Sequence, residues 1–224
     1  MNIKTIGFLG AMLGLSLTAC TTLNQLPHST QQVSSKIEKA PINQPIIAYF
    51  TASSADPDDE HSTEYSLTAE AKGYYRILLG RDDEGRFLVQ DYYANSKKPQ
   101  SLPFWIKDPE GLSSFKSIYV DGPVTILSEN GETIFKATVQ DYKPIGISQS
   151  FYRNGQLAQE NDYESFGEVH QKLWYENGKP AADAVLNMEY QIIKAQFWNL
   201  QGELVTDDDE IQAIADAIEQ KTAL

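Results

Sequence analysis

Cysteine and histidine, the residue types most diagnostic of nucleophiles, bases and metal ligands, are sparse in this 224-residue chain, and its 31 acidic residues are too many to single out a carboxylate pair. Cys20 is the only cysteine, and the three histidines, His28, His61 and His170, stand far apart in the sequence. The chain contains no His-Glu-x-x-His pair, no Gly-x-Ser-x-Gly turn and no glycine-rich phosphate loop. The acidic run 56–60 lacks the aspartate spacing and the glycine of a calcium loop. We therefore expect no catalytic residue, no metal site and no cofactor.

Cys20 follows a segment typical of export signals. Lys4 supplies a positive charge, and residues 6–19 form an uncharged run of 14 residues, too short for a membrane-spanning helix of about 20 residues. The sequence Leu17-Thr18-Ala19-Cys20 resembles the lipobox of bacterial lipoproteins. This resemblance implies cleavage after residue 19 and acylation of the Cys20 thiol, by palmitate or a similar fatty acid. Inner-membrane lipoproteins carry aspartate directly after the lipidated cysteine, whereas this chain has Thr21. The resemblance therefore implies an outer-membrane anchor facing the periplasm. The alternative is an ordinary signal peptide in which Cys20 is incidental.

The charge balance excludes some classes of partner. Without residues 1–19 the chain has 17 basic and 31 acidic residues, a formal net charge of −14. Such acidity argues against nucleic acid and against broad contact with anionic lipid headgroups. It suits a basic protein partner, although simple solubility explains it equally well. The 12 tyrosines favour β structure.

Composition divides the chain into segments. Residues 20–45 are rich in Thr, Ser, Gln, Asn and Pro and indicate a flexible tether behind the lipid. Residues 46–84 form an N-terminal β segment that begins with an expected strand over 46–52. A hairpin is expected from strands 73–79 and 86–93 around an acidic turn.

A repeat runs through residues 85–205. Asn130-Gly131, Asn154-Gly155, Asn177-Gly178 and Gln201-Gly202 share one frame, with their glycines 24, 23 and 24 residues apart. A degenerate copy has Ser96 in place of the glycine. Asparagine and glycine tolerate positive φ best, so each pair predicts a tight hairpin turn with both residues at positive φ. Stacked hairpins form an elongated antiparallel sheet, in which the aromatic residues Phe151, Trp174 and Trp198 occupy one face.

These repeats resemble bacterial MORN-variant repeats, whose pattern is a glycine, a short strand, Tyr-Tyr-x-Asn-Gly-(Lys/Gln/Glu) and a second strand. The segments 121–132, 146–156 and 167–179 carry the closest matches. MORN-variant repeats occur in antitoxins of toxin–antitoxin systems and in effector–immunity proteins. The resemblance therefore implies a mainly β repeat array that neutralises a toxic effector by binding it.

Residues 206–224 predict a C-terminal helix. Ile211, Ile214, Ala215 and Ile218 recur on one helical face, and Thr206 is the expected N-cap, paired with Asp209. Repeat arrays need a cap over their last open apolar face, and we expect this helix to supply it. A partner-binding helix is the alternative.

Together these features predict a non-catalytic, membrane-anchored protein that binds a protein partner, with an antitoxin or immunity role as its sharpest form. The expected partner-binding residues are exposed aromatics with acidic neighbours: Tyr152, Trp174, Tyr175, Glu176 and Trp198. For Trp174 and Trp198, packing in the core is the favoured alternative. The other possible functions are a structural envelope lipoprotein without a toxin partner and, less favoured, an enzyme acting on envelope polymers through a carboxylate pair.

Overall fold

A computed structural model of the chain describes residues 38–39, 45–52, 63–163 and 167–222. Cys20, the export signal, most of the tether, His28, His61 and the acidic run 56–60 lie outside the described residues. Within those ranges, no helix combines the length and apolar character needed to cross a membrane.

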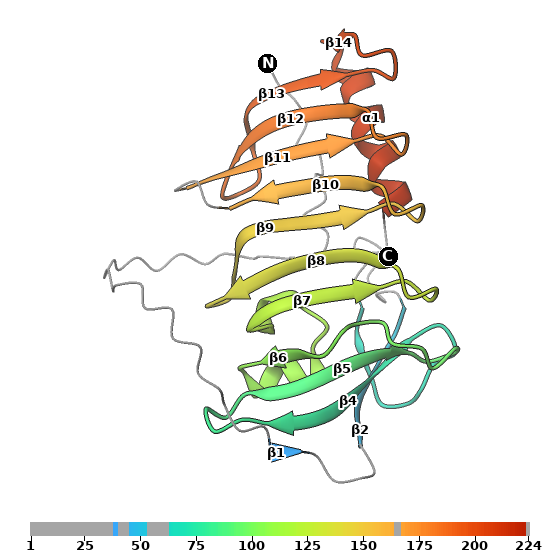
Figure 1. The fold of residues 1–224 in the computed structure, drawn as a ribbon, viewed down its shortest axis with the longest axis vertical. Helices are drawn as coiled ribbons and strands as arrows, with labels where there is room; N and C mark the ends of the chain where they lie inside the picture. The colour runs from blue at the N-terminus through green and yellow to red at the C-terminus, as the bar shows by residue number, and fades with distance from the viewer. Residues whose placement is uncertain (1–37, 40–44, 53–62, 164–166, 223–224) are drawn as a thin grey trace.

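The chain folds as two antiparallel sheets and one C-terminal helix, which confirms the expected mainly β class (Figure 1). The first sheet has the strand order β3-β2-β4-β5-β6, and β1 pairs with β4. Its strands are β1 (Glu38–Lys39), β2 (Ile46–Phe50), β3 (Tyr65–Ser66), β4 (Tyr74–Arg81), β5 (Phe87–Tyr93) and β6 (Phe104–Ile106). Two short 3-10 helices follow, η1 (Pro109–Ser113) and η2 (Ser117–Tyr119).

The second sheet contains eight strands in sequence order, so each strand pairs only with its neighbours along the chain (Figure 1). They are β7 (Gly122–Leu127), β8 (Thr133–Gln140), β9 (Lys143–Phe151), β10 (Leu157–Asp162), β11 (Glu168–Trp174), β12 (Pro180–Asn187), β13 (Ile192–Trp198) and β14 (Leu204–Val205). This is the expected elongated hairpin array. The expected division at residues 84/85 does not coincide with a sheet boundary, because β4 and β5 form one hairpin of the first sheet.

The two sheets share one apolar core. Val89, Phe104 and Ile106 of the first sheet belong to the same buried cluster as Val124, Ile126, Ala137 and Val139 of the second. Single bridges, Ser101 to Ile126 and Ile106 to Val120, continue the backbone pairing across the junction. The described residues of this segment, 46–52 and 63–84, are therefore part of one continuous elongated body (Figure 1).

The four glycine turns of the second sheet share one hydrogen-bond pattern. In the turn 152–156 the Tyr152 amide donates to the Gln156 carbonyl, and the Gly155 amide donates to the Tyr152 carbonyl, both at 2.9 Å. The turns 128–132, 175–179 and 199–203 repeat both bonds, and every glycine has φ between 80° and 87°.

The prediction that asparagine also takes positive φ is wrong. Asn130, Asn154 and Asn177 are not among the residues with positive φ, so each turn is a type I turn closed by a glycine bulge. The carboxamide gives the physical reason in two copies. Asn154 Oδ1 accepts from the amide two residues later at 2.9 Å, and Asn177 Oδ1 does the same at 3.0 Å.

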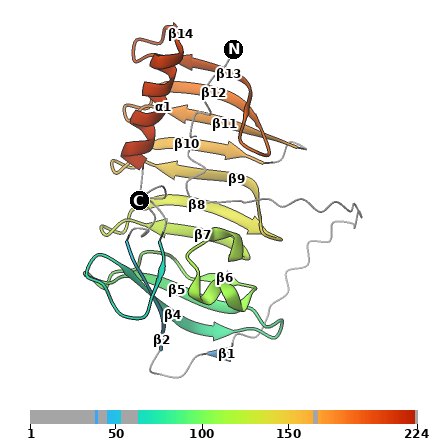
Figure 2. The same cartoon turned by 180° about the vertical axis from the view of Figure 1, so that it is seen from behind.

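The C-terminal helix α1 (Asp208–Thr222) confirms the expected helix, but its N-cap is not Thr206. Asp207 accepts a hydrogen bond from the Glu210 amide at 3.0 Å and thereby caps the first turn. Ile214 and Ile218 are buried against Leu173 of β11 and Phe197 of β13. The helix therefore covers one face of the last strands beside the glycine turns, as Figures 1 and 2 show from opposite sides.

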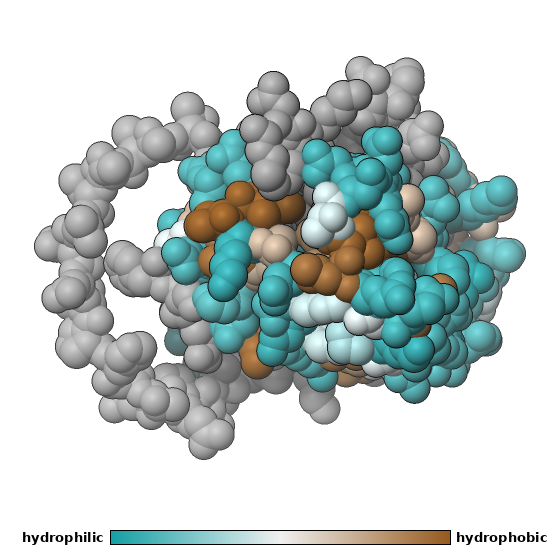
Figure 3. Space-filling model, turned by 90° about the horizontal axis from the view of Figure 1, so that it is seen from above, coloured by the Kyte–Doolittle hydropathy of each residue, from teal (hydrophilic) through white to brown (hydrophobic). Residues whose placement is uncertain are grey.

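The β13–β14 end of the array keeps apolar surface in contact with solvent. Ile193, Leu200 and Leu204 are 57%, 48% and 57% exposed. Figure 3 looks down on this end and shows apolar patches among polar residues. The helix thus caps an apolar face of the array, which confirms the expected capping helix, and it leaves the β14 edge uncovered.

Candidate functional site

Side chains of the second sheet alternate between two faces. The inner face carries the residues packed against α1, such as Leu173 and Phe197, and the outer face carries their neighbours Lys172, Trp174 and Trp198. We define the outer face by these alternate positions in β7–β14.

An apolar row crosses the outer face next to the glycine turns. The strand pairing aligns Phe151 with Leu157, Trp174 with Pro180, and Trp198 with Leu204. None of these six side chains is buried. The expectation that Phe151, Trp174 and Trp198 share a face is confirmed, and the alternative that Trp174 and Trp198 pack in the core is wrong. They are partly exposed because they point away from α1.

A polar row lies beside the apolar row, one pleat further along the strands. Its pairing is continuous from β7 to β13 through Thr125, Lys136, Gln149, Glu160, Lys172, Asp183 and Gln196. Gln149 Nε2 donates to Glu160 Oε2 at 2.6 Å. The Lys136 ammonium lies 5.5 Å from the centre of the Phe151 ring, so the two rows are in contact.

The outer face as a whole is electrically balanced. Its charged positions comprise four lysines and four acidic residues: Lys136, Lys143, Lys172, Lys194, Glu160, Asp162, Glu168 and Asp183. The outer face therefore has no net charge on a chain of net charge −13. His170 also belongs to this face, where its exposed ring lies 3.9 Å from a Glu168 oxygen.

Tyr152 and Tyr175 pack on the inner side of the sheet and are not presented to a partner. Tyr152 is 2% exposed, and its hydroxyl donates to the Trp174 carbonyl of the next hairpin at 2.7 Å. Tyr175 packs against the same core and donates to the Trp198 carbonyl, also at 2.7 Å. The expectation of an exposed Tyr152 is wrong because Tyr152 directly follows Phe151, the last residue of β9, and adjacent side chains of an extended chain point to opposite faces.

These tyrosines connect successive hairpins. Tyr93 makes the equivalent bond to the Leu127 carbonyl at 2.7 Å, so the position recurs in three copies of the repeat. Burial raises the pKa of Tyr93 and of Tyr152 to about 12. The 128–132 turn has Ser128 at this position and lacks the bond. Sequence alone could have indicated this role, because tyrosine occupies the same place in three copies.

Glu176 remains available on the turn edge, the edge of the sheet that carries the glycine turns. It is exposed, and its carboxylate forms an ion pair of 2.9 Å with Lys221 near the end of α1. Asn154 donates to the Glu176 carbonyl at 3.1 Å, and Lys179 donates to the Leu200 carbonyl at 2.8 Å. These contacts fix neighbouring turns to one another and to the helix.

The turn edge and α1 concentrate negative charge. The four glycine turns and residues 204–222 contain three basic residues, Arg153, Lys179 and Lys221. They contain ten acidic residues: Glu129, Glu132, Glu176, Glu203, Asp207, Asp208, Asp209, Glu210, Asp216 and Glu219. This excess of seven acids is about half of the chain's net charge of −13. The side chains of Glu132, Glu203 and Asp216 are exposed.

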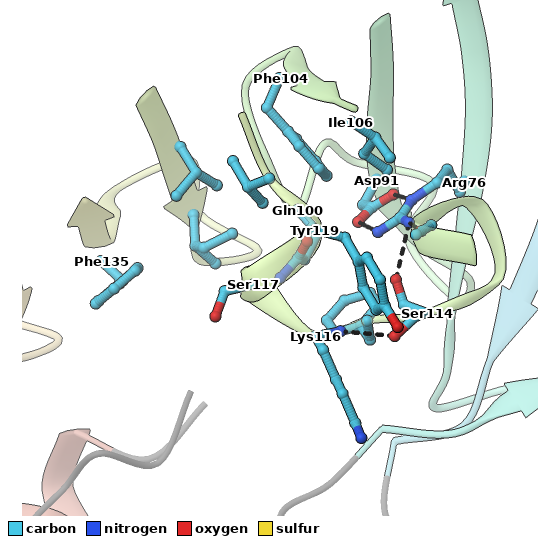
Figure 4. Close-up of a pocket in the computed structure, with 15 residues that line it drawn as sticks. Arg76, Asp91, Gln100, Phe104, Ile106, Ser114, Lys116, Ser117, Tyr119 and Phe135 are labelled. Carbon is cyan, nitrogen blue, oxygen red and sulfur yellow. Dashed lines mark hydrogen bonds and ion pairs between the residues drawn. The ribbon is translucent and has the colours of Figure 1, made fainter. Parts of the chain in front are cut away.

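The first sheet holds a buried polar group that no local sequence pattern predicts. Arg76 donates to both carboxylate oxygens of Asp91 at 2.7 Å, and also to the carbonyls of Gly111 and Ser114 (Figure 4). The cavity beside it has a volume of about 30 Å³, room for a water molecule. Pockets for small molecules are at least about tenfold larger. Arg76 therefore fastens η1 to the first sheet.

Among the described residues, no group of three or more histidine, cysteine or acidic side chains could hold a metal ion. Neither a scan of protein-family models nor a search of curated proteins finds a match to this chain.

Proposed function

We propose that this chain is a lipid-anchored, non-catalytic binding protein of the cell envelope that captures a basic protein at its acidic turn edge. The observation that carries the proposal is the uneven charge of the described surface. The turn edge and α1 hold ten acidic residues against three basic ones, whereas the outer face is balanced. A concentrated field of one sign steers an oppositely charged partner and accelerates its association.

The edge that carries this charge is held together by contacts between neighbouring turns. Tyrosine hydroxyls, Asn154 and Lys179 connect successive turns, and Lys221 ties Glu176 to the helix. A surface held in this way loses less conformational entropy on binding, which favours affinity.

An antitoxin or immunity role is the sharpest form of this proposal. Its support is the lipobox-like sequence ending at Cys20 and the resemblance of the hairpins to MORN-variant repeats. A protein anchored at the outer membrane would meet an incoming toxic effector in the periplasm. A gene for a secreted toxin next to this one would strengthen this role, and cells that lack the protein should then become sensitive to attack by sister cells.

The test uses the mature chain with Cys20→Ala as bait for envelope and secreted proteins of its own cells. Three neutralisations on the edge, Glu132→Gln, Glu203→Gln and Asp216→Asn, should weaken capture of a basic protein by about tenfold or more. A matched control removes three acidic charges from turns at the opposite edges of the two sheets: Asp83→Asn, Asp141→Asn and Glu189→Gln.

The two triple variants change the net charge equally, so they separate a local site from bulk charge. Capture that both variants weaken alike would contradict a site at the turn edge. If no basic protein is captured and cells without the chain resist sister-cell attack, the structural envelope role replaces the binding role.

A further inference from the structure

We propose that the outer face of the eight-stranded sheet binds the same face of a second copy. The inferred two-fold axis lies between the two faces, parallel to the strands, above the line between β10 and β11. Rotation about this axis reverses the order of the strands, so the polar row faces the polar row of the second copy and the apolar row faces its apolar row. Strand β10 then faces β11 of the second copy, and β9 faces β12.

The polar row is self-complementary under this rotation. Glu160 on β10 faces the second copy's Lys172 on β11, and the symmetry repeats the pair in the opposite sense. Gln149 on β9 faces the second copy's Asp183, to which its amide can donate. Within one chain Lys172 lies directly between Glu160 and Asp183, yet no ion pair within 4 Å joins it to either of these described residues. Its ammonium is therefore free to pair across the interface.

The apolar row is matched by the same operation. Leu157 on β10 faces the second copy's Trp174, and Phe151 on β9 faces its Pro180. On the other side of the polar row, Ile147 faces Val185. Ile147 is 51% exposed in the single chain, so a second copy would remove substantial apolar surface from water.

The dimensions also suit a dimer. Strands β8 to β13 each contain at least six residues and overlap fully about this axis. Six strands at about 4.8 Å spacing and six residues along each strand cover roughly 29 Å by 20 Å. The two faces together would bury about 1,200 Å², at the lower end of the range of specific interfaces. The strands of two packed sheets cross at up to about 30°, which shifts facing residues out of register. The shift is smallest next to the axis, where Glu160 of each copy faces Lys172 of the other.

The charge pattern of the outer face favours a second copy as its partner, because the face is neutral overall and the charges nearest its two-fold axis face opposite charges. Two chains of net charge −13 repel each other, but the outer face contributes no net charge to that repulsion. The acidic turn edge stays free in the dimer. The inference therefore goes beyond partner capture and does not depend on it.

A charge swap tests the geometry. The mature Cys20→Ala chain should be dimeric at micromolar concentration in sedimentation velocity. Glu160→Lys and Lys172→Glu should each raise the dissociation constant by about tenfold or more, because each places like charges opposite each other twice. The double variant E160K/K172E restores opposite charges and should return to within about threefold of the parent value. A monomeric parent chain, or a dimer that the single swaps leave intact, would overturn the proposal.

A second measurement remains decisive if a swapped variant unfolds. Gln149→Cys and Asp183→Cys are made in separate Cys20→Ala chains, mixed, and treated with a bis-maleimide whose spacer is about 8 Å long, because packed sheets lie about 10 Å apart and a disulfide cannot span that gap. In a dimer of one variant alone, the two cysteines are also offset sideways by three strands, about 14 Å. The mixture should therefore form a cross-linked heterodimer, whereas either chain alone should not. Equal cross-linking in a mixture of Gln149→Cys with Gln196→Cys, one strand further on, would contradict the inferred axis.

Discussion

The tyrosines at the glycine turns illustrate how single hydroxyl groups hold a repeat array together. Each buries its ring on the inner side and satisfies a carbonyl of the next hairpin, as in Tyr152 to Trp174. Tyr152→Phe should lower the free energy of unfolding by about 1–2 kcal/mol, since the carbonyl loses its partner. Urea denaturation checks this value. Tyr142→Phe, at an exposed tyrosine whose hydroxyl lies 3.5 Å from Asp108, should change stability by less than about 0.5 kcal/mol.

The same tyrosines should make the fold sensitive to alkali. Burial raises the pKa of Tyr93 and Tyr152 to about 12, from the ordinary value of 10.0. Between these values the unfolded chain has lost protons that the folded chain retains, so stability falls as pH rises. The stabilisation is fully present below pH 10 and is lost as pH rises through about 12. Melting temperatures between pH 9 and 12 should fall less steeply for the double variant Tyr93→Phe/Tyr152→Phe. Parallel curves would contradict this linkage.

The positions of the candidate site residues in the fold could be predicted from the sequence better than their exposure and contacts. The spacing located Tyr152, Trp174 and Tyr175 at the turns, but all five candidate site residues were expected to be exposed. Strand alternation places Trp174 and Tyr175 on opposite faces, because adjacent residues of an extended chain point in opposite directions, so one of the two lies on the face that packs against α1. Arg76 and Asp91 are 15 residues apart and carry no local pattern, so their ion pair becomes visible only when β4 pairs with β5.

At the scale of the elements, glycine φ sets the turn. Gly155 has φ of 80°, and an added Cβ there would meet nothing within 4 Å, so any cost of substitution is conformational. Gly155→Ala should destabilise by about 1 kcal/mol and Gly155→Val by more, because β-branched residues are disfavoured at positive φ. Thermal melts of both variants test the order. The turn 187–191 has Tyr190 at the equivalent position with φ of 58°, where the ring also packs against a buried cluster of β11 and β12 that offsets the conformational cost.

The helix depends on its inner surface. Ile218 is 4% exposed against the last strands, whereas its neighbour Ala217 faces solvent. Ile218→Asp should destabilise the chain by about 3 kcal/mol or more and cause aggregation, because it buries an unpaired charge and removes an apolar contact. Ala217→Asp adds the same charge and should be nearly neutral. Light scattering and denaturation of the two variants distinguish packing from charge. Deleting residues 206–224 should reproduce the aggregation, since it uncovers Leu173 and Phe197.

The sequence predicts where the turns and the helix lie better than it predicts their conformation and their packing partners. Evenly spaced Asn-Gly pairs located the turns, and the apolar period of residues 211–218 located α1. The turn type was missed because a type I turn with a glycine bulge and a two-residue turn favour the same dipeptide. The expected capping role of α1 is confirmed, but the sequence does not show which strands the helix packs against, since a helical period identifies the buried residues and not their partners.

At the scale of the whole molecule, charge divides the surface by role. The acidic excess lies on the turn edge and α1, and the balanced face lies at right angles to that edge on the same sheet. The proposed partner site and the proposed dimer face can therefore be occupied together. A dimer would also present two acidic edges to a partner, which increases avidity when the geometry allows both to bind.

The shared core should make both sheets unfold together. Val89, Phe104 and Ile106 pack in one cluster with Val124 and three further residues of the second sheet, so neither sheet keeps this core alone.

Trp105 reports on the first sheet and Trp198 on the second. One variant keeps only Trp105, through Trp174→Phe and Trp198→Phe, and another keeps only Trp198, through Trp105→Phe and Trp174→Phe. Each variant is also followed by far-UV circular dichroism, which corrects for its own change in stability. Fluorescence and dichroism should give coincident urea transitions within each variant, as expected for one cooperative unit. A Trp105 transition that precedes or trails the loss of β structure would show that the sheets unfold separately.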